Sequence, residues 1–297
     1  MKDIQTIQLA LSIAVAIIML GMGLSLTIGD FIRIKKQPTA VLVGLANQLI
    51  LLPIMGYMLI IFLGLKAEVA VGLMLIAACP GGPVSNLYCN LARGDVALSI
   101  TLTALTSMIT VFTIPLVVNQ ALVLFMDTRD IVPINFWQTV FKILMVTVVP
   151  VSIGMILYNY FPALAVKMEK PVKIVSSILL GSIITGAFVA NKEELLDALP
   201  YVGSATLALN VITMAVGFFI GRLFKLNYKE RVCISVECGI QNGALALFIG
   251  SMGVMANYPG VLMAPAVYGI LMFFTGAIFA AIANYFRPKE NDDRLVK

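Results

Sequence analysis

Nine long apolar stretches are the feature of this 297-residue sequence that most limits how it can fold. A helix that crosses a bilayer needs about 20 apolar residues, and each stretch is long enough for one. Only 12% of the residues are charged, whereas a soluble domain has about 25%. The sequence therefore predicts an all-α polytopic membrane protein with nine transmembrane helices, at about 7–27, 39–64, 67–92, 95–125, 134–160, 171–191, 199–224, 229–255 and 261–286.

The positions of the basic residues agree with this number of helices. With nine spans, fifteen of the twenty lysines and arginines fall on one side of the membrane, four fall on the other, and Lys142 lies within a span. Positive charge favours the cytoplasmic side. We therefore expect a multi-pass protein of a bacterial inner membrane, with the N-terminus outside and the C-terminus in the cytoplasm. Residues 1–297 then form a single membrane domain, and 287–297 are its cytoplasmic tail.

Composition excludes several classes of protein. The chain has no histidine, so serine-protease-like triads and HExxH zinc sites lack an essential side chain. Its four cysteines lie in apolar segments, which indicates buried packing residues and not a disulfide framework. The same composition excludes a nucleic-acid-binding protein, and we expect no organic cofactor.

An odd number of spans suggests an incomplete internal duplication. Spans 1–4 and spans 6–9 run through the bilayer in opposite senses, as an inverted repeat requires. The third span contains the sequence CPGGPVSN and the eighth contains ECGIQNGA, each with glycine and a polar pair ending in asparagine at mid-span. We therefore expect a truncated first repeat at 1–125 and a complete second repeat at 134–286.

Glu237 lies near the middle of the eighth span, whereas the other fourteen acidic residues fall at span ends, in loops or in tails. An ionised side chain at that depth costs about 3 kcal/mol on insertion scales, so it should face a cavity or a partner. A bound cation would compensate the charge, and so would a proton. Gly239 and Gly243 allow the helix to unwind here, which frees carbonyl oxygens of the kind that hard cations bind.

The third span contains a second predicted break. Pro80 and Pro83 have no N–H, so the Pro80-Gly81-Gly82-Pro83 segment cannot continue an α-helix. Pro83 suits the first turn of a new half-helix that runs to about Leu91. The N-terminus of such a half-helix attracts anions, while loosened carbonyls attract cations. Two broken helices at corresponding positions predict a transport site.

Three further polar residues fit this site. Ser99 and Thr103 are four residues apart in the fourth span and therefore share a helical face. Hydroxyls in membrane helices often bond to their own backbone, which is the alternative for this pair. Gln48 lies midway along the second span, where interhelical hydrogen bonding is the alternative to a ligand role.

At these residues the sequence resembles the bile acid:sodium symporter family. The resemblance runs along essentially the whole chain and includes GMGLSL at 21–26, CPGGPVSN at 79–86, LARGDVALS at 91–99 and ECGIQN at 237–242. It implies a panel domain and a core domain, with two helices that break and cross in the core. It also implies the nine-helix form, which lacks the first helix of ten-helix relatives.

The resemblance further implies two sodium ions and a substrate crevice. The first sodium site would take oxygens from Ser85, Asn86, Ser99, Thr103 and Glu237. The second would take side-chain oxygens of Gln48, Glu237 and Gln241 and the backbone carbonyls of Cys238 and Ile240. The substrate would lie between panel and core, near Pro83, Val84, Asn242 and Gly243.

The last helix departs from some bacterial relatives, which carry a Trp-His-Asn run there. The corresponding stretch here is Leu271-Met272-Phe273, which is wholly apolar. The substrate class therefore stays open between a bile-acid-like anion and a small carboxylate.

These observations predict a sodium-coupled symporter that moves an organic anion by alternating access. Its partners are the anion, sodium and the bilayer, and no oligomer is required. A proton-coupled carrier with Glu237 as the titrating group is the near alternative. An intramembrane enzyme is a distant one, because no histidine or other base accompanies the cysteines. A sensor is a third, although sensors usually bring a soluble output domain.

Overall fold

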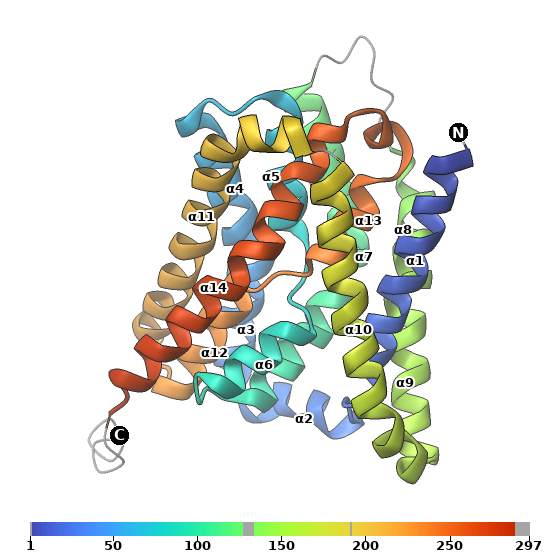
Figure 1. The fold of residues 1–297 in the computed structure, drawn as a ribbon. Coiled ribbons are helices and arrows are strands. Elements are labelled where there is room, and N and C mark those ends of the chain that lie inside the picture. The colour runs from blue at the N-terminus through green and yellow to red at the C-terminus, as the bar shows by residue number, and fades with distance from the viewer. Residues whose placement is uncertain (1, 127–133, 191, 289–297) are drawn as a thin grey trace.

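The computed structural model describes residues 2–126, 134–190 and 192–288, and this part of the chain is helical (Figure 1). The helices are α1 (Lys2–Gly23), α2 (Ile28–Lys36), α3 (Pro38–Ala46), η1 (Asn47–Leu51), α4 (Leu52–Leu63), α5 (Ala67–Ala78), α6 (Pro83–Leu91), α7 (Val96–Phe125), α8 (Phe136–Val146), α9 (Val148–Tyr160), α10 (Pro162–Ala190), α11 (Lys192–Leu223), α12 (Tyr228–Gly239), α13 (Gly243–Gly250), η2 (Gly253–Asn257), η3 (Pro259–Leu262) and α14 (Met263–Tyr285).

Local sequence explains several helix ends. Asp95 caps α7 by accepting a hydrogen bond from the Leu98 backbone N–H at 3.1 Å. Asn227 and Glu230 form a reciprocal capping box at the start of α12. Gly64 ends α4 in the left-handed conformation, with φ of 59°, which glycine adopts without a steric penalty.

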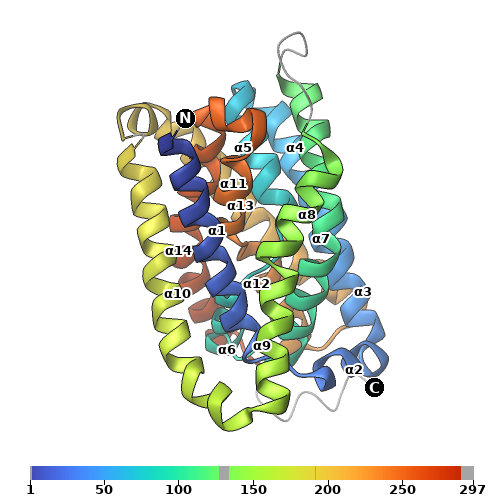
Figure 2. The same cartoon turned by 90° about the vertical axis from the view of Figure 1, so that its right-hand side faces the viewer.

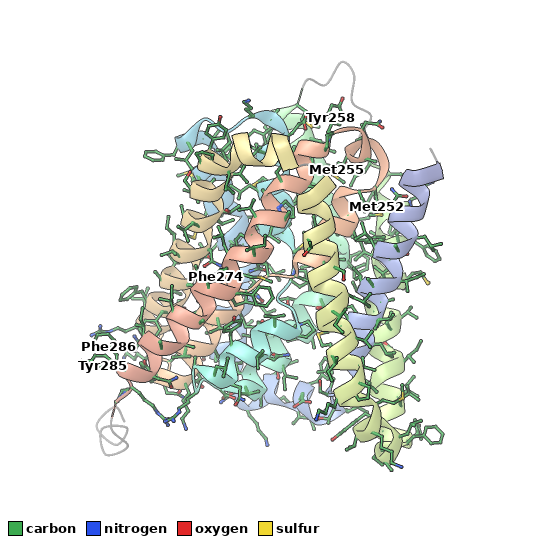
Figure 3. All side chains as sticks on the ribbon, viewed as in Figure 1. Met252, Met255, Tyr258, Phe274, Tyr285 and Phe286 are labelled. Atoms are coloured by element: carbon green, nitrogen blue, oxygen red, sulfur yellow. The ribbon has the colours of Figure 1, made fainter. Side chains whose placement is uncertain are left out.

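The protein is an integral membrane protein by the length and hydropathy of its helices. Within the described ranges, five helical segments are long and apolar enough to cross a bilayer: Pro38–Leu63, Val96–Phe125, Phe136–Tyr160, Ala198–Leu223 and Pro259–Tyr285. Helices α1 and α2 are a sixth candidate if they count as one span, bent by 74°. Large apolar side chains are exposed on the outside of the bundle, among them Phe274 and Tyr285 of α14 and Phe286 directly after it (Figure 3).

The number of spans expected from the sequence stays a prediction. The expected stretches at 67–92 and 229–255 are each divided into two short helices, α5 with α6 and α12 with α13. The stretch at 171–191 falls within α10, apart from residue 191, which lies outside the described ranges. The expected tail at 287–297 lies outside them from residue 289 onward.

Helices α1, α8, α9 and α10 lie side by side at one edge of the bundle, on the right in Figure 1 and toward the viewer in Figure 2. Helix α1 packs against α9 and α10. The backbones of α1 and α9 approach so closely that a Cβ on Gly154 would lie 2.6 Å from the Leu20 carbonyl oxygen. The remaining helices form the larger part of the bundle.

The interrupted helix formed by α12 and α13 lies in the interior of the larger part. Every residue from 232 to 252 is buried. Irregular backbone at membrane depth is tolerated only where protein or a water-filled cavity surrounds it. The packing around α12 and α13 therefore explains why the chain can leave the helical conformation there. The four cysteines are buried and free, as predicted.

Candidate functional site

The third apolar stretch is interrupted where the prolines predict. Helix α5 ends at Ala78, Cys79 and Gly82 are extended, and α6 begins at Pro83 and ends at Leu91. Pro83 takes the first turn of α6, where its missing N–H leaves no helical hydrogen bond unmade. The break thus follows directly from the Pro-Gly-Gly-Pro segment.

The eighth apolar stretch is interrupted between two glycines. Helix α12 ends at Gly239, Ile240 is extended with φ of −104° and ψ of 97°, and α13 begins at Gly243. The Asn242 side chain caps α13 by accepting a hydrogen bond from the Leu245 backbone N–H at 3.0 Å. An asparagine cap followed by glycine favours this new helix start.

The two interruptions meet in space. Gly81 and Gln241 form an isolated antiparallel bridge, and the Asn242 backbone N–H donates to the Pro80 carbonyl oxygen at 2.9 Å. Glycine at 81 permits the approach, because a Cβ there would lie 2.5 Å from Oε2 of Glu237. The two breaks therefore form one structural unit, and the Glu237 carboxylate lies against it.

The Glu237 carboxylate is fully buried, with 0% exposure. Oε1 accepts hydrogen bonds from the hydroxyls of Ser85 at 2.6 Å and Ser99 at 2.5 Å, and Oε2 accepts one from Thr103 at 2.9 Å. The Gln48 amide donates to Oε2 at 3.5 Å. All these donors are neutral, so they leave the net negative charge in place.

Each of the three hydroxyls also has a second acceptor. Ser85 lies 2.7 Å from the Gly82 carbonyl oxygen, Ser99 lies 2.8 Å from Oδ1 of Asn86, and Thr103 lies 2.9 Å from the Ser99 carbonyl oxygen. A hydroxyl has one proton and two acceptor lone pairs. Each can therefore turn its proton to the second acceptor and present an oxygen lone pair to a cation. The structure brings together all five residues expected at the first sodium site, from α6, α7 and α12.

The residues expected at the second sodium site gather around the last carbonyl groups of α12. Gln48 donates to the Glu237 carbonyl oxygen at 2.7 Å, and Gln241 donates to the Cys238 carbonyl oxygen at 2.8 Å. Both side chains are buried, and their Oε1 atoms have no hydrogen-bond partner among the described residues. Buried amide oxygens without a donor are the kind of oxygen ligand that a hard cation takes. Ile240 occupies the extended position next to them.

Gln48 lies on an irregular element that the sequence did not suggest. Residues Asn47–Leu51 form a π-helical turn between α3 and α4. Pro53 follows it and cannot donate a backbone hydrogen bond, which favours such a widening of the helix. Single π-helical turns are frequent at functional sites.

Sequence reasoning missed three polar residues at the end of α12. Asn210 and Tyr268 both donate to the Gly239 carbonyl oxygen, at 2.6 and 2.8 Å, and Thr213 donates to the Cys238 carbonyl oxygen at 3.2 Å. Asn210 and Thr213 are three residues apart on α11 and so share a face. An amide in the middle of an apolar span was the signal that could have drawn attention to Asn210.

A crevice of about 570 Å³ lies between helices α1 and α10 at the edge of the bundle and helices α6, α7, α13 and α14 of its larger part. Pro83, Val84, Asn242 and Gly243, the four residues expected near the substrate, all line it. The Asn242 side-chain nitrogen is buried and has no partner among the described residues. Met272 lines the same crevice, and every lining residue is uncharged.

Interrupted helices whose breaks meet beside a buried carboxylate and a crevice are characteristic of secondary transporters. The comparisons with known proteins agree with this class. The model of the Sodium Bile acid symporter family matches residues 12–198, so the chain belongs to that family. It is a membrane transporter and not an enzyme.

Relatives of this family come from bacteria, plants and mammals. The chain is 29% identical to the uncharacterized sodium-dependent transporter YocS of Bacillus subtilis, over 87% of this chain and 78% of that protein. It is 24% identical to the ileal sodium/bile acid cotransporter of Oryctolagus cuniculus, over 89% of this chain and 76% of that protein. It is also 28% identical to a probable chloroplastic sodium/metabolite cotransporter of rice, over 76% of this chain and about half (53%) of that longer protein.

Proposed function

We propose that this protein is a sodium-coupled symporter that carries an organic anion across the membrane by alternating access. The observation that carries the proposal is the Glu237 carboxylate, which is buried where the two interrupted helices meet and accepts hydrogen bonds from neutral donors alone among the described residues. A monovalent cation would neutralise it where neutral donors do not. The relatives described as sodium-dependent support sodium as that cation.

Two sodium ions are transported in this proposal, and both are cargo. The first binds among Ser85, Asn86, Ser99, Thr103 and Glu237, whose hydroxyls have second acceptors for their protons. The second binds to Gln48, Glu237 and Gln241 and to the carbonyls of Cys238 and Ile240, where two amide oxygens have no partner within the described ranges. Two sodium ions with one monoanion move one net positive charge, which contributes about 2.3 kcal/mol per 100 mV of membrane potential.

The substrate occupies the crevice, against Pro83, Val84, Asn242 and Gly243. Because the lining is uncharged, the anion is held by the N-terminal ends of α6 and α13 and by amide donors such as Asn242. The volume of about 570 Å³ accepts either a bulky bile-acid-like anion or a small carboxylate.

The topology in this proposal has nine spans in a bacterial inner membrane, with repeats at 1–125 and 134–286. Helices α1, α8, α9 and α10 are the panel, and the other helices are the core. The first residues of α1 and the last residues of α14 lie at opposite ends of the bundle, which fits an odd number of spans (Figure 1). The N-terminus is outside and the C-terminus is in the cytoplasm.

The described conformation is inward-facing in this topology. The crevice extends from the helix breaks along Asn90 of α6 and Val96 of α7. Those residues flank the α6–α7 connection, which carries Arg93 and lies on the side assigned to the cytoplasm. Substrate and sodium would leave the sites in this direction.

Uptake into proteoliposomes tests the proposal. Radiolabelled taurocholate and lactate serve as a bulky and a small probe, with a sodium gradient at constant pH or a pH gradient without sodium. We expect uptake of one of the probes only with the sodium gradient, and it should be faster with a negative interior. Uptake driven by the pH gradient alone would favour the proton-coupled alternative, with Glu237 as the titrating group.

A further inference from the structure

The carbonyl groups at the end of α12 accept hydrogen bonds from side chains of other helices. The last four carbonyls of an α-helix lack partners within the helix. Here the Val236 carbonyl accepts from the Ile240 backbone N–H at 2.8 Å, which leaves those of Glu237, Cys238 and Gly239. These residues are buried, so the free carbonyl oxygens need side-chain donors.

The Gly239 carbonyl oxygen receives two such donors from two other helices. Nδ2 of Asn210 on α11 donates to it at 2.6 Å, and the Tyr268 hydroxyl on α14 donates at 2.8 Å. Nδ2 of Asn210 also lies 3.2 Å from the Tyr268 hydroxyl oxygen, so the three groups form one cluster. Asn210 and Tyr268 are both fully buried, at 0% exposure.

The orientation of the Asn210 amide follows from this contact. A carbonyl oxygen can only accept, so the amide must turn its nitrogen to Gly239. Its Oδ1 atom is then left buried and without a partner among the described residues. An unpaired buried acceptor destabilises a fold, so a polar side chain at this position needs a compensating role. Holding the Gly239 carbonyl is the role that the contacts show.

Gly239 is also fixed by packing. It lies directly against the Met214 side chain of α11, with no room for a Cβ atom between them. The Gly239 peptide groups are therefore held by steric contact with α11 and by hydrogen bonds from α11 and α14. Gly239 stands between Cys238 and Ile240, whose carbonyls are the backbone ligands of the proposed second sodium site. A rotation of the Gly239 backbone would turn both carbonyls away from their positions.

We infer that Asn210 and Tyr268 are positioning residues for sodium: they fix the Gly239 carbonyl and thereby orient the Cys238 and Ile240 carbonyls toward the second ion. The inference rests on the proposed sodium coupling. Residues that orient metal ligands without touching the metal typically change its affinity by 10-fold or more when they are replaced. Asn210 and Tyr268 touch neither the crevice nor the Glu237 carboxylate in the contacts described above.

The chain offers a closely matched control. Tyr228 of α12 donates its hydroxyl to the Ala283 carbonyl oxygen of α14 at 2.6 Å. It therefore joins the same two helices as Tyr268, with a similar bond, but near the start of α12. Thr206 is a second control, because it is fully buried on α11 and, within the described part of the chain, bonds only to carbonyls of its own helix.

Equilibrium binding of ²²Na⁺ to the purified full-length protein, without organic substrate, tests the inference. Tyr268→Phe and Asn210→Ala should each raise the dissociation constant of sodium about 10-fold. Tyr228→Phe and Thr206→Val should leave it within about twofold of the unmodified value. Thermal unfolding without sodium should be affected similarly by Tyr268→Phe and Tyr228→Phe, since each loses one hydroxyl bond to a carbonyl.

Two results would overturn the inference in distinguishable ways. If the unmodified protein binds sodium and Tyr268→Phe binds it equally tightly, the positioning role is wrong while the proposed function stands. If the unmodified protein binds no sodium, the proposed function fails and the inference falls with it. If Asn210→Ala does not fold, Tyr268→Phe decides the question alone, because it removes a single oxygen atom.

Discussion

Each hydroxyl around Glu237 can play two roles, as a hydrogen-bond donor to the carboxylate and as an oxygen ligand for a cation. In the described state Ser85, Ser99 and Thr103 donate to the carboxylate. Each also has a neutral acceptor within 2.9 Å to which the same proton can turn. The site can therefore keep a buried carboxylate hydrogen-bonded without a cation and offer oxygen ligands when a cation enters. Such a rearrangement needs only rotation of hydroxyl groups.

Thr103→Val tests this reading of the hydroxyls. The change removes the hydroxyl that contacts both carboxylate oxygens, at 3.1 and 2.9 Å. We expect it to weaken sodium-dependent uptake at least 10-fold at low sodium, with partial recovery at high sodium, as loss of one metal-site contact does. Thr106→Val is the control, because Thr106 is equally buried on α7 but, among the residues the structure describes, bonds only to α7 carbonyls. Equal sodium dependence in both variants would contradict the ligand role of Thr103.

Several residues of the candidate site could be selected from the sequence for a physical reason and others followed only from the family resemblance, while their roles as sodium ligands stay predictions. Glu237 stands out because a carboxylate at mid-span is costly. The π-helical turn that carries Gln48 and the donors Asn210 and Tyr268 could not be predicted in the same way. Their roles depend on which helices pack against the end of α12, and one chain's hydropathy pattern carries no information about that packing.

The two interrupted helices are joined to each other at their breaks. Proline and glycine fix where each helix stops, so both breaks were predictable to within a residue or two. The bridge between Gly81 and Gln241 is a long-range contact and appears only in the folded structure. It ties the break after α5 to the break after α12, so neither can shift without moving the other.

Gly81→Ala and Gly82→Ala form a matched pair that tests this contact between the two breaks. A Cβ on Gly81 would lie 2.5 Å from Oε2 of Glu237, so the carboxylate or the bridge must move. A Cβ on Gly82 would come no closer than 3.7 Å to its nearest neighbour, a normal van der Waals contact. We expect Gly81→Ala to lower sodium affinity about 10-fold or more, and Gly82→Ala to change it about twofold or less. Measurement of ²²Na⁺ binding without substrate separates this effect from any effect on the crevice. Similar affinities in both variants would show that the close approach at Gly81 has no part in binding.

The whole molecule divides into the edge formed by α1, α8, α9 and α10 and the larger part, which holds both helix breaks. Helical content and membrane location could be predicted from hydropathy, because nothing else accounts for so many apolar stretches. The nine-span topology stays a prediction, since within the described ranges five long helices and one bent pair are long and apolar enough to cross a bilayer. The halves of the two interrupted helices are each too short to cross it alone.

Labelling of single cysteines tests the topology in intact cells. The four native cysteines are buried, so their background reaction with a membrane-impermeant maleimide should be low. Lys66 and Lys225 are both exposed, in the α4–α5 and α11–α12 connections. We expect Lys66→Cys to react from outside, and Lys225→Cys to react only after the membrane is made permeable. The reverse pattern would invert the orientation, and reaction of both from outside would contradict the nine-span topology.

The central claim is that sodium neutralises Glu237, and equilibrium binding of ²²Na⁺ to the purified protein and its Glu237→Gln variant tests it most directly. The variant keeps the shape of the side chain and removes its charge, and Glu230→Gln near the start of α12 is the control. We expect saturable binding to the unmodified protein and to Glu230→Gln, and none above background to Glu237→Gln at the same pH. Binding of sodium to Glu237→Gln with unchanged affinity would contradict the account.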